Sequence, residues 1–419
     1  MGLSKFKLKH LVVLLLTVFA IMEFYTLSYG LNTVALIAGC GLAIILAFIF
    51  PIESLVDRVN FPVIIYLLSL CAYSLLSYYW AIDKNEALEY STLMLRNTAT
   101  FIIFSAMFRS RNVCRNAQWF FVAIVIAYQA TAVWEISTWQ HLWVSRYYGI
   151  ETFIPTGPFF GENLLAAFML MLLPYPLFIP WLYNRWWIKL VSGLIVLAGL
   201  VIMTIQGARI ALLAGFVLTA WVMLKYTNWK SKLISMIIVV VLLLGLLHIA
   251  RPYVSIVWGI FDREISSIGM ESNSNRMSSV KIRQQLVKES LDLTANSGFM
   301  GVGAGNIEKY MDTDIVYRTA GIINPHNYFL ELMGNYGVGF LLWFLALYLG
   351  WARGLYMASK AGDYNKKGFY LMHLFALLMF VPASALPSSI KWNHLIWIMF
   401  AMFNRISHPD FWREQANCE

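Results

Sequence analysis

The residues best suited to chemistry lie in the stretch IINPHNYFLELMGNYGVGF, where Pro325, His326 and Asn327 precede a long apolar run. Histidine is the side chain whose ordinary pKa permits proton transfer near neutral pH. Pro325 favours the start of a helix, so we expect His326 to be held near that start, with Glu331 five residues later. A lone histidine is more often structural than catalytic. The position of His326 nevertheless favours catalysis or direct binding of an acceptor.

Several cations could accompany this histidine. Arg209 lies in IQGARIALLAGF, where a helix N-terminus after Gly207 would favour an anion such as phosphate. The alternative for Arg209 is simple snorkelling to a membrane interface. Arg276 lies in SNSNRMSSVKIR, and Lys281 and Arg283 follow closely enough to share its role. Arginine suits phosphate because its planar fork donates two parallel hydrogen bonds, although Arg276 alone could equally be a solvated loop residue.

Three other motifs carry less information. GPFFGENLLAAF opens an apolar segment, and its Glu162 and Asn163 either line a cavity or only cap a helix. GVGAGN at 301–306 resembles a phosphate-binding glycine run, but it follows no strand, so we expect a turn that folds a loop back over the membrane face. No Asp-x-Asp pair with a second ligand cluster accompanies DTD at 312–314, so no metal site is expected.

The composition of the chain indicates a polytopic membrane protein. Of 419 residues, 60% are hydrophobic and 13% are charged, whereas about a quarter of a soluble domain is charged. The net charge of +9 is better explained by lysines and arginines that fringe a membrane than by nucleic-acid binding. The four cysteines show no paired spacing, so neither a disulfide nor a zinc site is expected.

Apolar runs long enough to cross a bilayer predict an all-α bundle of about 12 transmembrane helices. No alternating pattern of barrel type appears, and only helices satisfy their own backbone groups in lipid. The predicted spans cover residues 10–29, 32–50, 61–80, 90–108, 117–135, 161–182, 188–205, 207–225, 233–250, 335–354, 368–385 and 391–406.

The distribution of lysine and arginine predicts that both termini are cytoplasmic, because positive residues then gather in the cytoplasmic loops. The short outer loops hold only Lys84, Arg146, Arg209 and Lys391. We therefore expect a multi-pass protein of the cell inner (cytoplasmic) membrane.

This orientation divides the chain into three parts. Residues 1–250 would form transmembrane helices 1–9, and 335–419 would form helices 10–12 with a cytoplasmic tail. Residues 251–334 would form one long extracytoplasmic (periplasmic) loop domain with short helices, which faces the same side as Arg209 and contains Arg276 and His326. Long loops usually carry function, so we place the active site there.

These motifs, taken in order, resemble the O-antigen ligase/polymerase family of integral membrane glycosyltransferases. The matching stretches are QGARIALLAGF, NRMSSVKIR, GFMGVGAGN and NPHNYFLELMGNYGVGF, and GPFFGENLLAAF resembles the sixth-span motif of the family. The resemblance covers about 157–340, and the flanking spans match only in number and hydropathy. It implies a GT-C-like, inverting, metal-independent transferase without cofactors, which uses undecaprenyl-diphosphate-linked glycans at the outer leaflet.

The resemblance also implies roles for individual residues. Arg209 and Arg276 would grip the donor diphosphate, and His326 would orient or deprotonate the acceptor hydroxyl. Family members often have Ser or Thr where this chain has Ala208, which puts a hydroxyl contact there in doubt. Residues that could support the site are Asn327, Lys281, Arg283, Glu162, Asn163 and Glu331.

Three functions remain open on the sequence. The first is a polymerase that joins lipid-linked repeat units of an O-antigen, capsule or exopolysaccharide, and the second is a ligase that transfers a finished glycan to lipid A–core or another acceptor. A lipid or polysaccharide transporter is the third, although the concentration of polar residues in one outer loop favours surface chemistry. The expected partners are the glycan donor and acceptor, membrane lipids, a chain-length regulator and a flippase.

Overall fold

The part of the chain that the structure describes is helical throughout. The computed structural model describes residues 57–109, 111–142, 145–147, 149–183, 185–226, 279–313, 321–361, 364–386 and 393–413, and no strand occurs among them. Its helices are α4 Phe61–Ser77, α5 Lys84–Met107, α6 Arg111–Thr138, α7 Glu162–Leu172, α8 Pro174–Leu182, α9 Trp186–Ile205, α10 Arg209–Tyr226, α13 Ser279–Asn296, α14 Ile307–Thr313, α15 Tyr328–Tyr336, α16 Val338–Ala361, α17 Tyr364–Ala383, α18 His394–Ser407 and α19 Pro409–Arg413.

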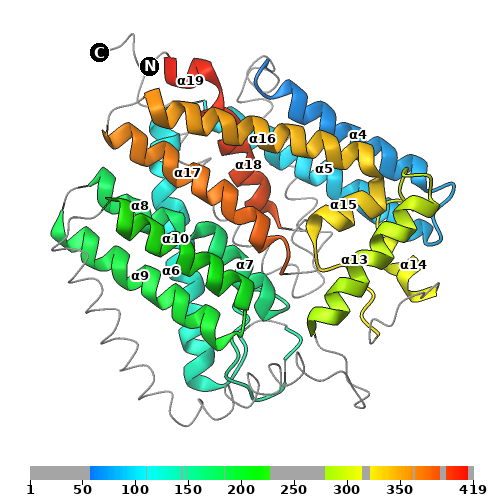
Figure 1. Cartoon of the computed structure of the whole chain (residues 1–419), viewed down its shortest axis with the longest axis horizontal. Coiled ribbons are helices and arrows are strands. Elements are labelled where there is room, and N and C mark those ends of the chain that lie inside the picture. Colours follow the sequence, from blue (N-terminus) through cyan, green and yellow to red (C-terminus); the bar gives the residue numbers. More distant parts are fainter. Residues whose placement is uncertain are drawn as a thin grey trace, which may run out of the picture.

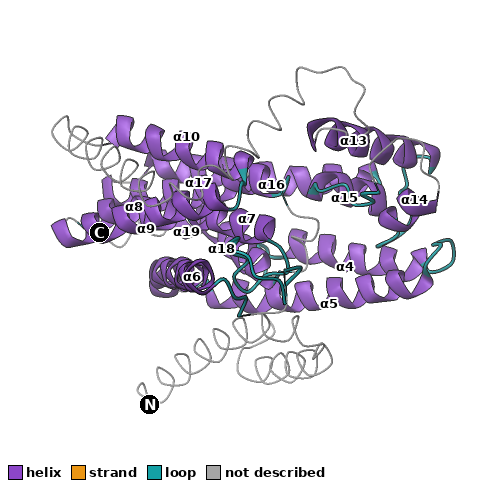
Figure 2. Cartoon of the chain, turned by 90° about the horizontal axis from the view of Figure 1, so that it is seen from below, coloured by secondary structure: helices purple, strands orange, loops and turns teal. Residues whose placement is uncertain are grey.

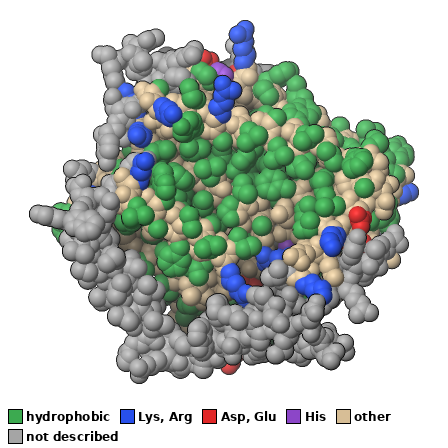
Figure 3. Space-filling model, viewed as in Figure 1, with side chains coloured by type: hydrophobic (Ala, Val, Ile, Leu, Met, Phe, Trp, Pro, Cys, Tyr) green, Lys and Arg blue, Asp and Glu red, His purple; other side chains and the backbone are tan. Residues whose placement is uncertain are grey.

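The long helices have the length and apolar surface of membrane spans. Four stretches of described helix are long and apolar enough to cross a bilayer: Asn112–Thr138, Glu162–Leu182, Trp186–Ile205 and Val338–Ala361. Figure 3 shows a broad apolar face with lysine and arginine side chains at its two ends. This distribution is typical of a bundle whose middle contacts lipid. The chain is therefore a multi-pass membrane protein.

The predicted count of twelve spans stays a prediction. The predicted spans 10–29, 32–50 and 233–250 lie outside the described residues. Each of the other predicted spans overlaps a described helix. Helix α4 is apolar, but its 17 residues make it slightly shorter than the four stretches named above.

The helices pack as pairs that place α13, α14 and α15 at one end of the molecule. Helix α4 packs along α5, α16 along α17, and α17 against α7 and α8, while α18 crosses against α5. Figures 1 and 2 agree that α13–α15 lie beside the end of α4 and the start of α16. We call this region the site end of the bundle.

A buried aromatic cluster fixes α15 to the bundle. The ring of Tyr328, the first residue of α15, lies 5.4 Å from the ring of Phe344 in α16 and 5.5 Å from that of Phe380 in α17. The Phe380 ring in turn lies 5.2 Å from that of Phe400 in α18. Inside a membrane such packing stabilises through van der Waals contact between close-packed rings, and it fixes the start of α15 to α16 and α17.

The glycine run GVGAGN docks the helices of the site end onto the rest of the bundle. It forms a turn in which Val302 N–H donates to Gly334 O at 2.8 Å and Gly303 N–H donates to Asn335 O at 3.2 Å. The side-chain oxygen of Asn306 accepts a 2.6 Å hydrogen bond from the backbone of the turn between α4 and α5. Through these hydrogen bonds the glycine run packs closely against the backbone of α15 and of the turn between α4 and α5.

Candidate active site

His326 lies in a strained turn just before α15. Its φ is +50°, in the left-handed region that residues other than glycine seldom adopt. Its backbone N–H donates to Asn324 Oδ1 at 2.8 Å, and the Asn324 amide donates to the carboxylate of Glu308 in α14. Strained backbone persists only where the surroundings hold it, and it concentrates at functional sites. The hydrogen bonds through Asn324 to Glu308 therefore anchor this turn to α14.

The other side of the turn is fixed by the cap of α15. Asn327 Oδ1 accepts hydrogen bonds from the N–H groups of Phe329 and Leu330, at 2.9 and 3.2 Å. The N–H of Tyr328 donates to Ser384 O at the end of α17, at 3.0 Å. Asn327 therefore acts on the site as a helix cap. It leaves the preceding histidine at the positive end of the helix dipole.

His326 is poised to accept a proton. Burial lowers the pKa of its imidazole, and the nearby positive charges of Arg283 and Arg146 lower that pKa further. The imidazole is therefore neutral at neutral pH. Its Nδ1 is buried and has no hydrogen-bond partner among the described residues, while the side chain as a whole is partly exposed. A neutral, partly accessible imidazole is the form that a general base requires.

Arg146, whose charge acts on His326, lies in the loop between α6 and α7. Its guanidinium forms an ion pair with the carboxylate of Glu162, the first residue of α7, which is only 7% exposed. The same guanidinium lies 4.7 Å from the centre of the Tyr147 ring. The backbone N–H of Arg146 donates to the backbone oxygen of Phe160 at 2.9 Å. In the sequence, Arg146 stands out only as a positive charge in a short outer loop. The available signal was an arginine followed by two tyrosines, a short distance before Glu162.

Two further contacts fasten the loop that carries Arg146. The buried carboxylate of Glu135 in α6 accepts two hydrogen bonds of 2.8 Å from the backbone N–H groups of residues 156–157. The side chain of Gln206, at the end of α9, donates to Pro155 O at 3.0 Å. These hydrogen bonds therefore fix the loop to α6 on one side and to the turn before α10 on the other.

The predicted phosphate-binding cations are placed differently from one another. Arg283 is half-buried on α13, and its positive charge lowers the pKa of His326, whereas Lys281 is exposed one half-turn earlier. Arg209 is exposed at the start of α10, directly after the turn that is hydrogen-bonded to the loop carrying Arg146. Arg276 lies outside the described residues.

The two remaining predicted residues differ in burial. Asn163 is partly exposed beside Glu162 at the start of α7. Glu331 is 2% exposed and lines a cavity of about 20 Å³ with Tyr328, Asn335 and apolar residues of α4 and α5. Glu331 therefore lies between α15 and the α4–α5 pair. The charges of Arg283 and Arg146 act on His326, and Arg146 is paired with Glu162.

Comparison with known proteins agrees with these features. Residues 194–345 match the O-antigen ligase family, and this range contains Arg209, Arg283 and His326. The teichuronic acid biosynthesis protein TuaE of Bacillus subtilis (strain 168) is 24% identical over 344 residues, which cover 79% of this chain and 68% of that protein. The resemblance expected from the motifs is confirmed for residues 194–345, the part of the chain that matches the O-antigen ligase family model.

Proposed function

We propose that the chain is a membrane glycosyltransferase that polymerises undecaprenyl-diphosphate-linked repeat units of a surface polysaccharide at the outer face of the cytoplasmic membrane. The observation that carries this proposal is the position of His326, a neutral histidine beside Arg283 and Arg146, inside a domain of the O-antigen ligase family. A base next to concentrated positive charge suits a reaction that deprotonates a hydroxyl and releases a diphosphate.

The proposed step uses His326 as the base. The imidazole takes the proton of the acceptor hydroxyl as the hydroxyl oxygen attacks C1 of the donor sugar. The bond from C1 to the diphosphate oxygen breaks, and its electron pair leaves with the lipid diphosphate. Attack from the side opposite the leaving group inverts the anomeric centre.

The arginines stabilise the leaving group in this scheme. Negative charge grows on the diphosphate as the bond breaks, and fixed guanidinium groups favour that charge most in the transition state. We assign this role to Arg283, Arg209 and Arg276, with Arg146, which is paired with Glu162, as a fourth candidate. Phosphate also suits the guanidinium fork geometrically.

A ligase is the second candidate, because the matching family is described as O-antigen ligase. It would use the same donor and the same base, but it would transfer the glycan once, to lipid A–core or another acceptor. The polymerase is preferred because the relative in Bacillus subtilis is named for the biosynthesis of teichuronic acid.

Purified protein in lipid nanodiscs, supplied with lipid-linked repeat units and a lipid A–core acceptor, distinguishes these functions. A polymerase releases lipid diphosphate and builds a ladder of products, whereas a ligase gives a single transfer to the second acceptor. His326→Ala should reduce release at least about 100-fold, the usual contribution of a general base. His408→Ala, at the end of α18, is the matched control and should leave the rate unchanged. Absence of release from the wild-type protein would instead support a transporter.

A further inference from the structure

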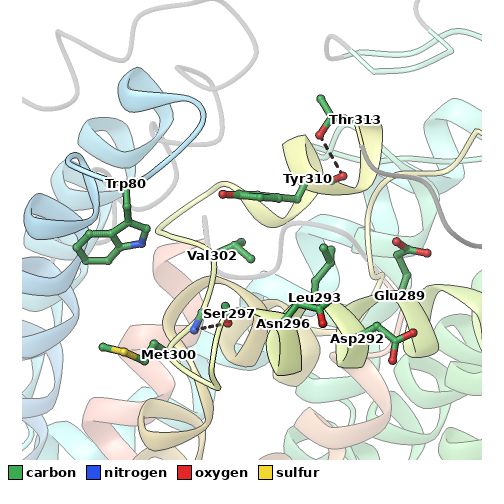
Figure 4. Close-up of a pocket in the computed structure, with 11 residues that line it drawn as sticks. Trp80, Glu289, Asp292, Leu293, Asn296, Ser297, Met300, Val302, Tyr310 and Thr313 are labelled. Atoms are coloured by element: carbon green, nitrogen blue, oxygen red, sulfur yellow. Dashed lines mark hydrogen bonds between the residues drawn. The ribbon is translucent and has the colours of Figure 1, made fainter.

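Four large apolar or aromatic side chains are exposed at the rim of the site end. Tyr79 and Trp80, in the turn after α4, are 81% and 45% exposed, and Phe299 and Met300, after α13, are 61% and 68% exposed. Figure 4 shows Trp80 and Met300 on the same side of a groove of about 960 Å³ between the end of α4, α13 and α14. We call these four residues the rim patch. A cluster of exposed apolar side chains marks an interaction surface.

The backbone holds Phe299 outward in an unfavourable conformation. Phe299 has φ +65°, in the left-handed region that phenylalanine seldom adopts. Its N–H donates to Thr294 O at 2.9 Å, and the O of the next residue, Met300, accepts a 2.7 Å hydrogen bond from the Tyr73 hydroxyl. Since the Phe299 side chain is 61% exposed, packing inside the protein does not account for an aromatic residue at this position. A contact outside the protein would account for it.

The rim patch lies where a candidate membrane span begins. The first N–H of the span Val338–Ala361 donates to Phe299 O at 3.0 Å. The ring of Tyr73 lies 5.5 Å from that of Trp80 and 5.4 Å from that of Phe340, in the first turn of α16. Both halves of the patch are therefore tied to the start of α16, at the level where this span leaves the bilayer.

The rim patch also continues the exposed apolar face of the bundle. Leu68, Leu75 and Leu76 of α4 are 46%, 50% and 57% exposed. Tyr79 follows in a turn that extends the helix, because its N–H donates to Leu76 O at 3.2 Å. On the neighbouring α16, Leu342 is 60% exposed. Tyrosine and tryptophan are enriched where such a lipid-facing surface meets the headgroups.

Helix α13 links the rim patch to the candidate active site. Its last turn leads toward Phe299, and Arg283, whose charge acts on His326, lies in its second turn. In Figure 1 this helix runs across the ends of α4 and α16 rather than along them. A contact at the end of α13 would therefore fix how far Arg283 stands from the membrane surface.

We propose that the rim patch inserts into the interfacial layer of the leaflet around the site end and anchors α13 to the membrane surface. The partner is the bilayer itself. Trp80 and Tyr79 each have an apolar body and a polar end, which suits the headgroup level, and Phe299 and Met300 suit the upper acyl chains. Insertion does not depend on the reaction, so its test needs no substrate.

Photo-crosslinking to lipid tests the insertion. p-Benzoylphenylalanine replaces Phe299 or Tyr79 in the full chain, with one copy in each nanodisc of phosphatidylethanolamine and phosphatidylglycerol, and mass spectrometry identifies the adducts. Leu349 of α16, which is 63% exposed, is the lipid-facing control, and Asp312, exposed on α14, is the control in water. Lipid adducts at Phe299 and Tyr79 should match the yield at Leu349 and be lost at Asp312.

Two outcomes of this experiment would overturn the insertion. The first is lipid adducts at Leu349 but at neither residue of the rim patch. The second is an adduct that forms only in nanodiscs with two copies and joins one chain to the other, which would assign the patch to a contact between copies.

Limited proteolysis tests whether the rim patch anchors α13, which trypsin can cut after Lys281, Arg283 or Lys288. Phe299→Ser combined with Met300→Ser should raise the rate of these cuts in nanodiscs about tenfold, because the apolar surface that enters the interface is lost. Phe299→Leu combined with Met300→Leu keeps an apolar surface, so this matched control should be cut at the wild-type rate. Equal rates for the serine and leucine pairs would show that the patch does not hold α13.

The unfolding temperature separates an anchor from internal packing. Both pairs of substitutions should leave it unchanged in detergent, because the two side chains are mostly exposed. A lower unfolding temperature of the serine pair in detergent would mean that these side chains stabilise the protein from within, and would contradict the anchor.

Discussion

Arg146 and Glu162 form an ion pair, and the positive charge of Arg146 lowers the pKa of His326. The two partners come from different segments, a loop after α6 and the first turn of α7. The carboxylate is the more buried member, with a side chain 9% exposed against 45% for the arginine. Glu162 thus holds Arg146 in place and offsets part of its charge. The protonation of His326 depends on both.

The first prediction concerns the pH dependence of transfer. A histidine that acts as a base is active only above its pKa, and the ordinary value of about 6.5 is already lowered here. Arg146→Gln removes a positive charge, so the pKa of His326 should rise and the acidic limb of kcat/KM should move to higher pH. Glu162→Gln leaves the arginine charge less compensated, so the limb should move to lower pH.

Profiles of kcat/KM against pH measure these shifts directly, because they report the pKa of the free enzyme. Arg353→Gln, an exposed arginine on α16, is the control and should leave the limb in place. Shifts in the same direction for Arg146→Gln and Glu162→Gln would contradict electrostatic control of His326 by this pair.

The second prediction concerns the diphosphate. Arg283→Ala should raise the donor KM about tenfold or more, since a charge-assisted hydrogen bond to phosphate is among the stronger contacts. Arg283→Lys should recover only part of this loss, because the planar fork is gone. The assay is run well above the pKa of His326, where loss of the positive charge no longer changes its protonation. Lys288→Ala, an exposed change on the same helix, should have no effect, and a donor KM unchanged in Arg283→Ala would remove this arginine from the diphosphate site.

Residue types and hydropathy predicted the helical bundle, because lipid requires internally satisfied helices. They also selected His326 as the candidate base, because few side chains transfer protons near neutral pH. The electrostatic effect of Arg146 on His326 was not predicted, since it joins segments far apart in the sequence. Glu331 was expected to support the site. It is buried between α15 and the α4–α5 pair, a position that spacing along the chain does not indicate because His326 precedes the helix. The role of Asn327 as a cap needed the geometry of α15.

The third prediction concerns the docking of the site end. Gly337 has φ +90°, and a Cβ atom there would lie 2.5 Å from Phe299 O. Gly337→Ala should therefore lower the unfolding temperature and expose α13 to trypsin, with a cost above about 1 kcal/mol. At Gly339, in the first turn of α16, a Cβ atom would meet nothing within 4 Å. Gly339→Ala should be neutral or stabilise the helix by up to about 1 kcal/mol. Equal protease resistance of the two variants would show that the close approach at Gly337 is not needed.

The fourth prediction concerns an ion pair at the opposite end of α4. Asp57 accepts a 2.5 Å hydrogen bond from Arg405 Nη1, and Arg405 is 5% exposed. Asp57→Asn leaves this guanidinium buried without its counter-charge, which should cost about 3–5 kcal/mol. Arg109 lies 3.3 Å from the same carboxylate but is 45% exposed, so Arg109→Ala should cost no more than about 1 kcal/mol. Thermal unfolding of both variants in nanodiscs, against wild type, measures the difference.

The same pair predicts how stability changes with acid. Burial tends to raise the pKa of Asp57, but the hydrogen bond and charge of Arg405, with smaller contributions from Asn60 and Arg109, bring it below its ordinary value. A carboxyl with a lowered pKa in the folded state stabilises the protein above the unfolded pKa, and this contribution is lost as pH falls through the folded pKa. Wild type should therefore lose stability relative to Asp57→Asn as the pH falls below about 4. A difference in unfolding temperature that stays constant from neutral to acidic pH would mean that Asp57 does not carry this charge in the folded protein.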